Sequence, residues 1–148
     1  MRPSKKEYYL KIAEAVAQRS TCLRRKYGAV IVKDDEIIST GYNGAPRGIN
    51  NCCDIGYCFR TKYKIPHGEQ IEKCLAVHAE QNAIISASRR DMLGSTLYLV
   101  GFEVDGNKIL PTRPCRICKL LIINAGIDNV VTWDWTQNFR GGINNDGQ

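Results

Sequence analysis

The sequence predicts an α/β fold, in which helices pack on a layered sheet. Two observations indicate it: a β-hairpin is expected between residues 28 and 42, and helical and strand patterns alternate after it. The length of 148 residues fits one domain, which we expect to span residues 1–148.

The N-terminal part of the chain predicts a helix followed by this hairpin. Ser4-Lys5-Lys6-Glu7 matches a capping box, and the apolar pattern after it predicts a helix over residues 5–19. The residues of that pattern are Tyr8, Ile12, Ala15 and Val16. Residues 28–33 are a short β-branched run, and residues 36–42 are expected to form its partner strand across a turn at Asp34-Asp35.

The chain after the hairpin alternates between loops, helices and strands. Residues 43–76 are rich in glycine and proline with little periodicity, which predicts a long loop that is functional or braced by something other than a core. The pattern then predicts a helix over residues 79–94, a strand over 96–100, a loop over 101–114, a helix over 114–126 and a strand over 130–133. We expect the polar end, residues 141–148, to be mobile.

The positive charge lies in the first part of the chain. The formal net charge is +6, from 21 Lys and Arg against 15 Asp and Glu. Residues 1–33 hold nine Lys and Arg and two Asp and Glu, whereas residues 34–148 hold twelve against thirteen. This asymmetry argues against a uniformly basic nucleic-acid-binding protein and indicates that an anion binds near the start of the chain.

Targeting and membrane signals are absent from the sequence pattern. No apolar run follows the basic start, so we expect no secretory signal. The longest aliphatic run, Leu120 to Ile123, is far shorter than the roughly 20 residues that span a bilayer, so we expect no membrane partner. Seven cysteines without a signal peptide predict a cytoplasmic protein whose clustered thiols bind metal or take part in catalysis.

The strongest functional signal combines His78-Ala79-Glu80 with Pro114-Cys115 and Cys118. Each half is weak by itself, because His-x-Glu pairs are common on surfaces and Cys-x-x-Cys also occurs in redox sites. Together, each at the start of an expected helix, they match the signature of zinc-dependent nucleobase deaminases.

The chemistry of these residues supports a catalytic zinc site. Cys115 and Cys118 are three residues apart, so one turn of helix places both sulfurs on one face, in a first turn that favours thiolates. With His78 as the third ligand, the fourth tetrahedral position stays open for water, whose pKa zinc lowers to about 7. Glu80 is then free to move protons between this water and the substrate. A closed zinc site with a fourth cysteine and a thioredoxin-like redox pair are the alternatives, but neither explains Glu80 or Pro114.

Several further stretches carry a resemblance to a known family. They are Cys22-Leu-Arg-Arg-Lys-Tyr-Gly28, Gly28-Ala-Val-Ile-Val, Gly41-Tyr-Asn-Gly44, His78-Ala-Glu-Gln-Asn-Ala-Ile84, Pro114-Cys-x-x-Cys118 and Ile122-Ile-Asn-Ala-Gly-Ile127. With these motifs, residues 5–132 resemble the deoxycytidylate (dCMP) branch of the cytidine deaminase superfamily. The resemblance implies a three-layer α/β/α fold with a mixed five-stranded sheet between helices. It also implies hydrolytic deamination of dCMP to dUMP and ammonia, which supplies dUMP for thymidylate synthesis.

The resemblance also implies partners and substrate contacts. Members of the family are commonly homo-oligomers, often hexamers, and some respond to dCTP and dTTP as effectors. Carried onto this chain, Asn43 would contact the nucleotide sugar and Arg24 its phosphate, with Ala79 and Arg116 as further substrate contacts. A turn role for Asn43 and a solvated basic run for Arg24 to Lys26 remain open alternatives. The loop over residues 101–113 departs from the family pattern, in which the strand before it runs almost directly into the Pro-Cys-x-x-Cys helix.

A second, structural zinc ion is a separate hypothesis. Four cysteines resemble positions that recur in this branch: Cys22, Cys52, Cys58 and Cys74. Zinc held by them would tie the long loop to the start of the first strand. Cys53 or His67 is an alternative ligand, and buried free thiols are the plain alternative.

Other functions stay open from the sequence alone. Cytidine, dCTP, guanine and tRNA adenosine are alternative substrates of the same chemistry, although the net negative charge of residues 34–148 argues against tRNA. A zinc-stabilised nucleotide-binding protein without catalysis is an alternative from another class, and the presence of Glu80 argues against it.

Overall fold

A computed structural model describes residues 1–139 of the chain. Its centre is one five-stranded sheet in the order β2-β1-β3-β4-β5, in which β3 and β4 are parallel and all other neighbours antiparallel. The strands are β1 (Arg25–Lys33), β2 (Glu36–Tyr42), β3 (Thr96–Glu103), β4 (Asn129–Val131) and β5 (Thr136–Asn138). The mixed five-stranded sheet is thereby confirmed. Strand β1 starts three residues earlier than expected, and β3 ends three residues later than expected.

The hairpin between β1 and β2 forms where it was predicted. Asp34 and Asp35 both have positive φ angles, of 51° and 62°, as a two-residue hairpin turn requires. The Asp35 carboxylate accepts a hydrogen bond from the Tyr9 hydroxyl and pairs with Lys5, so the turn is fastened to the first helix.

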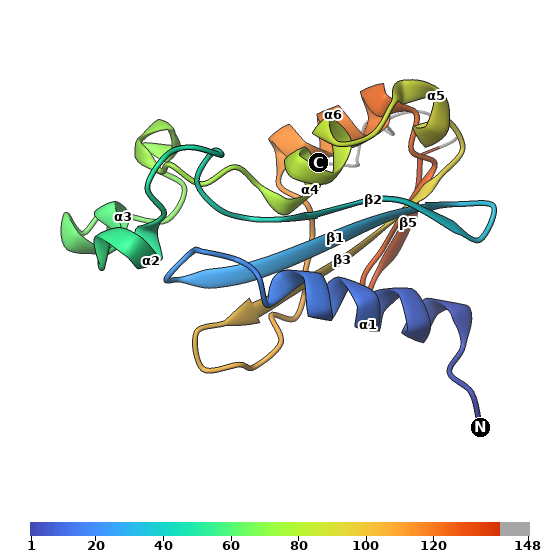
Figure 1. The fold of residues 1–148 in the computed structure, drawn as a ribbon, viewed down its shortest axis with the longest axis horizontal. Helices are drawn as coiled ribbons and strands as arrows, with labels where there is room; N and C mark the ends of the chain where they lie inside the picture. Colours follow the sequence, from blue (N-terminus) through green and yellow to red (C-terminus); the bar gives the residue numbers. More distant parts are fainter. Residues whose placement is uncertain (140–148) are drawn as a thin grey trace.

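Helices cover both faces of the sheet, which confirms the three-layer arrangement (Figure 1). Helix α1 (Lys5–Ala17) packs on one face, and α4 (Ala79–Ile85), α5 (Arg89–Met92) and α6 (Arg116–Ala125) lie on the other. Each face has its own core. The first includes Leu10, Ala13, Val30 and Val100, and the second includes Ile31, Ala83, Leu99 and Ile122.

Helix α1 faces the sheet with a different set of residues from the pattern that predicted it. Its buried residues are Tyr9, Leu10, Ala13 and Ala17, whereas Tyr8 is 48% exposed. Gly28 explains how close the helix lies, because a Cβ atom there would be 2.1 Å from the Ala13 carbonyl oxygen. Small residues on both elements therefore set the spacing between the two layers.

The single helix predicted over residues 79–94 is wrong, because the chain forms two short helices there. Helix α4 ends at Ile85, and Ser88 caps α5 by accepting a hydrogen bond from the Asp91 N–H at 3.2 Å. The next helix also starts later than expected: α6 begins at Arg116 with Cys115 as its N-cap, so Pro114 precedes the helix.

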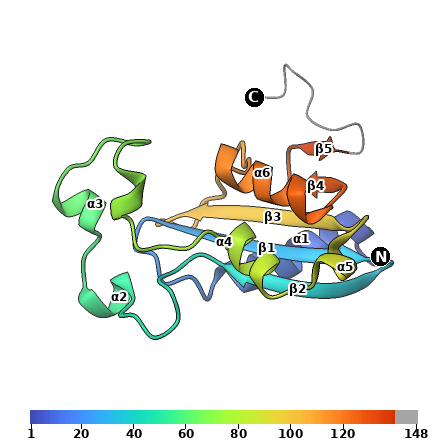
Figure 2. The same cartoon turned by 90° about the horizontal axis from the view of Figure 1, so that it is seen from above.

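The long loop after β2 carries short helices and projects beyond the end of the sheet in both views (Figures 1 and 2). The helices are α2 (Cys52–Ile55), α3 (Phe59–Lys62) and the 3-10 helix η1 (Ile71–Lys73). The one buried residue of these helices is Arg60, whose guanidinium donates to the carbonyl oxygens of Pro66, Glu69 and Gln70 at 2.6–3.0 Å. A buried cation and its backbone acceptors thus organise part of the loop in place of an apolar core.

Within residues 1–139, the helices are too short or too polar for any of them to cross a bilayer. The tail that we expected to be mobile, residues 141–148, lies outside the described residues.

Candidate active site

The start of helix α4 is held tightly against strand β2. A Cβ atom on Gly41 would lie 2.3 Å from the Ala79 carbonyl oxygen and 2.4 Å from the Ala83 amide nitrogen, so only glycine permits this approach. The Ser39 hydroxyl donates to the Ala83 carbonyl at 2.7 Å, and the Asn82 side chain donates to the Tyr42 carbonyl at 2.8 Å. The strand therefore fixes the depth and the rotation of α4.

His78 is the N-cap residue of α4. Its backbone N–H donates to the Gln81 side-chain oxygen at 2.8 Å, which is half of a capping box. The preceding residue, Val77, exchanges two backbone hydrogen bonds with Gly44, at 2.7 and 3.1 Å. The backbone on both sides of the His78 side chain is thus fixed before any ligand binds.

Cys115 and Cys118 lie at the start of helix α6. Cys115 is the N-cap, and its sulfur accepts a hydrogen bond from the Cys118 N–H at 3.4 Å. The expectation that the two sulfurs share one side of a first helical turn is borne out by this geometry. Cys118 is fully buried, and Cys115 is exposed.

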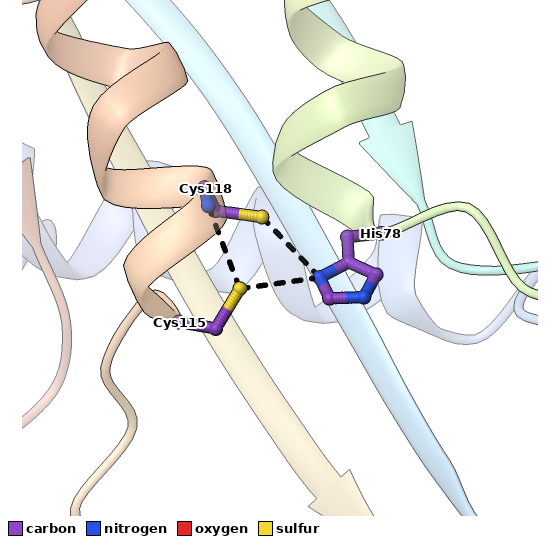
Figure 3. Close-up of side chains that lie close together, drawn as sticks. All are labelled: His78, Cys115 and Cys118. Atoms are coloured by element: carbon purple, nitrogen blue, oxygen red, sulfur yellow. Dashed lines mark hydrogen bonds between the residues drawn. The ribbon is translucent and has the colours of Figure 1, made fainter. Parts of the chain in front are cut away.

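The three side chains converge between α4 and α6 (Figure 3). His78 Nδ1 lies 3.6 Å from the Cys115 sulfur and 3.3 Å from the Cys118 sulfur. Ligand atoms around a tetrahedral zinc ion, with bonds of about 2.0–2.3 Å, lie about 3.5–3.8 Å apart. The donor set and its spacing therefore fit zinc, and three protein ligands leave one tetrahedral position for water.

The pKa values of the two thiols, Cys115 and Cys118, are shifted in opposite directions. The hydrogen bond from Cys118 lowers the pKa of Cys115 to about 4, with help from His78 and the Cys118 N–H. The same hydrogen bond, together with burial, raises the pKa of Cys118. The Cys115 hydrogen bond also raises the pKa of His78 above 6.5. Cys115 is therefore the thiol of the pair that ionises more readily.

Glu80 lies two residues after His78, inside the protein. Its residue surface is 5% exposed, and burial raises the pKa of its carboxyl group above the usual value. The positive charge of His78 and the neighbouring Cys118 side chain act in the opposite direction and lower this pKa. A buried carboxyl group with a raised pKa beside a metal site is suited to accept a proton and to release it again.

Asn43 is buried and hydrogen-bonded to the backbone of β1. Its side-chain oxygen accepts from the Tyr27 N–H at 2.8 Å, and its side-chain nitrogen donates to the Arg25 carbonyl at 2.9 Å. An amide of this kind keeps one N–H and one lone pair for a further partner. The predicted sugar contact of Asn43 therefore stays a prediction, with a structural role beside it.

The other predicted substrate residues lie on different elements. Ala79 is the first residue of α4 and is fully buried. Arg116 is the exposed first residue of α6, next to Cys115. Arg24 precedes β1. Burial raises the pKa of the Cys58 thiol, but hydrogen bonds with Thr61 lower it and the charge of Arg24 lowers it further, so the Arg24 side chain lies on the side of the long loop. Their contacts with a substrate stay predictions.

The four remaining cysteines of the second-zinc hypothesis come near one another. Burial raises the pKa of Cys52, and the neighbouring thiols of Cys22, Cys58, Cys74 and Cys53 raise it further. Cys52, Cys58 and Cys74 line a hollow of about 380 Å³ in the long loop. Among residues 1–139, however, only the His78 group brings three ligand atoms within 4.8 Å of one another.

Sequence comparison identifies the family. A family model described as the cytidine and deoxycytidylate deaminase zinc-binding region matches residues 3–133. The chain belongs to the cytidine and deoxycytidylate deaminase family. The chain thus carries a zinc-binding deaminase region, and His78, Cys115 and Cys118 form a group within it that could hold the metal ion.

The relatives of this deaminase chain include enzymes of phages and yeasts. It is 41% identical over 134 residues to the deoxycytidylate deaminase of Mycobacterium phage D29, covering 88% of this chain and 94% of the phage protein. It is 38% identical to the Schizosaccharomyces pombe deoxycytidylate deaminase over 88% of this chain, but spans only 37% of that yeast protein. A crystal structure of the cyanophage S-TIM5 dCMP deaminase with dCMP and dUMP is 30% identical, with a TM-score of 0.61 over 89% of this chain and 82% of the other.

The sequence alone assigns no positioning role to four residues that hold the candidate ligands of this deaminase site in place. They are Ser39, Gly41, Gln81 and Asn82. Gln81 had a usable signal, because a glutamine three residues after a helix-capping position is half of a capping box. The other three act across the space between β2 and α4. Gly41 and Asn82 belong to the motifs quoted above, but only the fold shows that they position the helix.

Proposed function

We propose that this chain catalyses the hydrolytic deamination of dCMP to dUMP and ammonia. The observation that carries the proposal is the buried Glu80 carboxyl group beside three converged zinc ligands, on a chain that belongs to the deaminase family. The choice of dCMP is supported by relatives named deoxycytidylate deaminase at 38–41% identity.

The chain's own groups account for the proton transfers. Zinc held by His78, Cys115 and Cys118 supplies Lewis acidity, which makes a water molecule nucleophilic near neutral pH. Glu80 takes a proton as the water oxygen attacks C4 of the cytosine ring, and it delivers that proton to the ring nitrogen N3. It then transfers the second proton of the former water to the exocyclic amine, which leaves as ammonia while the C4 carbonyl forms.

The phosphate of the substrate is proposed to meet the basic residues near the site. Arg116 is the more favourably placed candidate, because it is exposed at the first turn of α6, where the helix dipole also attracts anions. Arg24 is the second candidate, and Asn43 is proposed to contact the sugar through its remaining N–H. The backbone of Ala79 is proposed to contact the base.

Ammonia release tests the proposal directly. The zinc-loaded protein is incubated with dCMP, CMP, dCTP, deoxycytidine, cytidine, guanine and tRNA. We expect the highest kcat/KM with dCMP. Activity on none of these compounds would refute deamination, and equal kcat/KM for dCMP and deoxycytidine would refute the phosphate contacts of Arg24 and Arg116.

We also propose a second, structural zinc ion held by Cys22, Cys52, Cys58 and Cys74. The mutual effect of these thiols on the pKa of Cys52 and the lack of an apolar core in the long loop support it. Metal analysis should find two zinc ions per chain, and one after the substitution Cys52→Ser. The control is Cys53→Ser, which changes the exposed neighbouring thiol and should keep both ions. One ion in the unmodified protein would refute this site.

Assembly, effectors and location are further parts of the proposal. Helix α6 buries Cys118, Ile122 and Ala125 but leaves Ile117, Leu120 and Leu121 exposed by 37–54%, which supports a homo-oligomer such as a hexamer. Light scattering measures the mass of the assembly, and a monomer at micromolar concentration would contradict the proposed oligomer.

Activity assays with added dCTP and dTTP test the proposed effectors. The seven free thiols support a cytoplasmic location.

A further inference from the structure

The segment between β3 and α6, residues 104–115, contacts the turn that joins β4 to β5 through two of its side chains. Lys108 lies 4.1 Å from the ring centre of Trp133 and 3.3 Å from a carboxylate oxygen of Glu14. Arg113 lies over the ring of Trp135, with 4.8 Å between its guanidinium carbon and the ring centre. Two cations of one segment thus contact two aromatic rings of one turn.

Hydrogen bonds within the turn, and one to helix α1, hold it in place independently of residues 104–115. Thr132 is fully buried, its N–H donates to the Trp135 carbonyl at 2.7 Å, and its hydroxyl donates to the Asp134 carboxylate at 3.0 Å. The indole N–H of Trp133 donates to the Glu14 carboxylate at 2.9 Å. The two rings and the Asp134 carboxylate therefore have fixed positions relative to the sheet and to α1.

The guanidinium group of Arg113 contacts two residues of this turn, Asp134 and Trp135. One nitrogen donates to the Thr112 carbonyl at 3.1 Å and to the Asp134 carboxylate at 3.4 Å, while the guanidinium carbon lies over the Trp135 ring. Thr112 is 4% exposed, and its hydroxyl donates to the Ile109 carbonyl, so the backbone that carries Arg113 is also fixed. The Arg113 side chain is 40% exposed and the Asp134 side chain 30% exposed, which makes substitutions there tolerable.

We propose that Arg113 is a positioning residue that fixes the start of helix α6, and with it the zinc ligands Cys115 and Cys118. Only Pro114 separates Arg113 from Cys115, and the proline ring restricts the φ angle between them. A displacement of Arg113 therefore moves the sulfur of Cys115 relative to His78. The inference rests on the proposed function only in taking these cysteines as zinc ligands.

The contacts of Arg113 distinguish it from Arg116. The guanidinium of Arg113 already has an anion, a carbonyl and an aromatic ring as partners. Arg116 makes no hydrogen bond or ion pair within the described part of the chain. Arg116 is thus free for a phosphate, whereas Arg113 would have to give up its contacts to bind one.

Zinc affinity and kinetics of four variants test the inference: Arg113→Ala, Arg113→Lys, Asp134→Ala and the double variant Arg113→Ala/Asp134→Ala. Zinc affinity is measured by competition with a chromophoric chelator, and kcat and KM with dCMP and with deoxycytidine. Arg19→Ala, which removes an exposed arginine after α1, is the control for loss of charge. Arg116→Ala serves as the comparison for a phosphate contact.

Arg113→Ala should weaken zinc affinity about fivefold, since an exposed ion pair and a cation–π contact together contribute that much. It should leave KM for dCMP and the preference for dCMP over deoxycytidine unchanged, and Arg113→Lys should restore most of the affinity. The effects of Arg113→Ala and Asp134→Ala should not add in the double variant. Arg116→Ala should instead raise KM for dCMP at unchanged zinc affinity.

Two results would overturn the inference. One is wild-type zinc affinity in Arg113→Ala with a raised KM for dCMP alone, which would make Arg113 a phosphate contact. The other is full additivity of Arg113→Ala and Asp134→Ala. A wild-type protein that binds no zinc would refute the proposed function instead, so the two failures are distinguishable.

Discussion

The backbone N–H of His78 donates to the side-chain oxygen of Gln81, so a zinc ligand and a helix cap are one residue. The same helix turn carries Glu80 between them. The orientation of His78 relative to its helix is therefore tied to that of Glu80, which follows it by two residues in the same capped turn.

Replacing Gln81 with alanine should loosen this capped turn. Loss of the capping hydrogen bond is expected to lower the free energy of unfolding by about 1 kcal/mol, and to weaken zinc affinity about fivefold. Gln81→Glu keeps the acceptor oxygen and should retain the affinity better than alanine. Chemical denaturation and chelator competition measure the two quantities. The control is Gln18→Ala, which removes an exposed glutamine after α1. If both variants bind zinc with equal affinity, the capping hydrogen bond of Gln81 does not position His78.

Replacing Glu80 with glutamine should separate metal binding from catalysis. Gln has nearly the same shape but accepts no proton, so turnover of dCMP should fall by about 10²- to 10⁴-fold while zinc content stays at the wild-type level. Ammonia release and metal analysis on the same sample check both. Retained turnover would contradict the proton-transfer role. Glu36→Gln, at the exposed start of β2, is the matched control and should keep activity.

Replacing Gly41 with alanine should push helix α4 away from β2. The new methyl group would lie 2.3 Å from the Ala79 carbonyl and 2.4 Å from the Ala83 nitrogen, both backbone atoms that cannot move aside alone. We expect a loss of about 1–3 kcal/mol in unfolding free energy, with weakened zinc affinity.

The control for Gly41 is Gly68→Ala in the long loop. Gly68 has φ of +83° and no atom within 4 Å of an added Cβ, so alanine there suffers backbone strain without a clash. It should lower stability yet leave zinc affinity unchanged. If both variants weaken zinc affinity equally, the close contact between β2 and α4 does not position the ligand.

The hairpin turn predicts a pH dependence of stability. The hydrogen bonds from Lys5 and Tyr9 lower the pKa of the Asp35 carboxyl below 3.8 in the folded protein. Its contribution to stability is therefore fully present above pH 3.8 and disappears as the pH falls through the folded pKa. The variant Asp35→Asn lacks the contribution of the ionised carboxylate to stability, and asparagine tolerates the positive φ angle of this turn position. The difference in unfolding free energy between wild type and Asp35→Asn should shrink below about pH 4, and a constant difference would contradict it.

The zinc ligands and Glu80 are predictable from sequence because their spacing is local. A three-residue separation of cysteines and a two-residue separation of His78 and Glu80 have direct geometric meaning on a helix. Asn43 is harder to interpret, because its sequence context does not reveal that its amide bridges the backbone of Arg25 and Tyr27. Such contacts depend on which strands become neighbours, and that is a property of the whole fold.

The errors in the helices have physical reasons as well. The apolar pattern continues past Ile85 and hides the break, although Ser88 three residues before Asp91 is a cap signal. Helix α6 starts two residues later than expected, because Cys115 acts as its N-cap and accepts a hydrogen bond from the Cys118 N–H. The fifth strand, Thr136–Asn138, is polar and short, so only pairing with β4 defines it.

The site also has a consequence for the entropy of the unfolded chain. His78 lies 37 residues from Cys115 and 40 from Cys118 along the chain, so a zinc ion held by all three closes a large covalent loop. An unfolded chain that lacks the metal gains the freedom of that loop, which includes β3 and the segment around Arg113. A zinc ion held there would link the starts of helices α4 and α6 reversibly, and its free concentration would then contribute to the folding equilibrium.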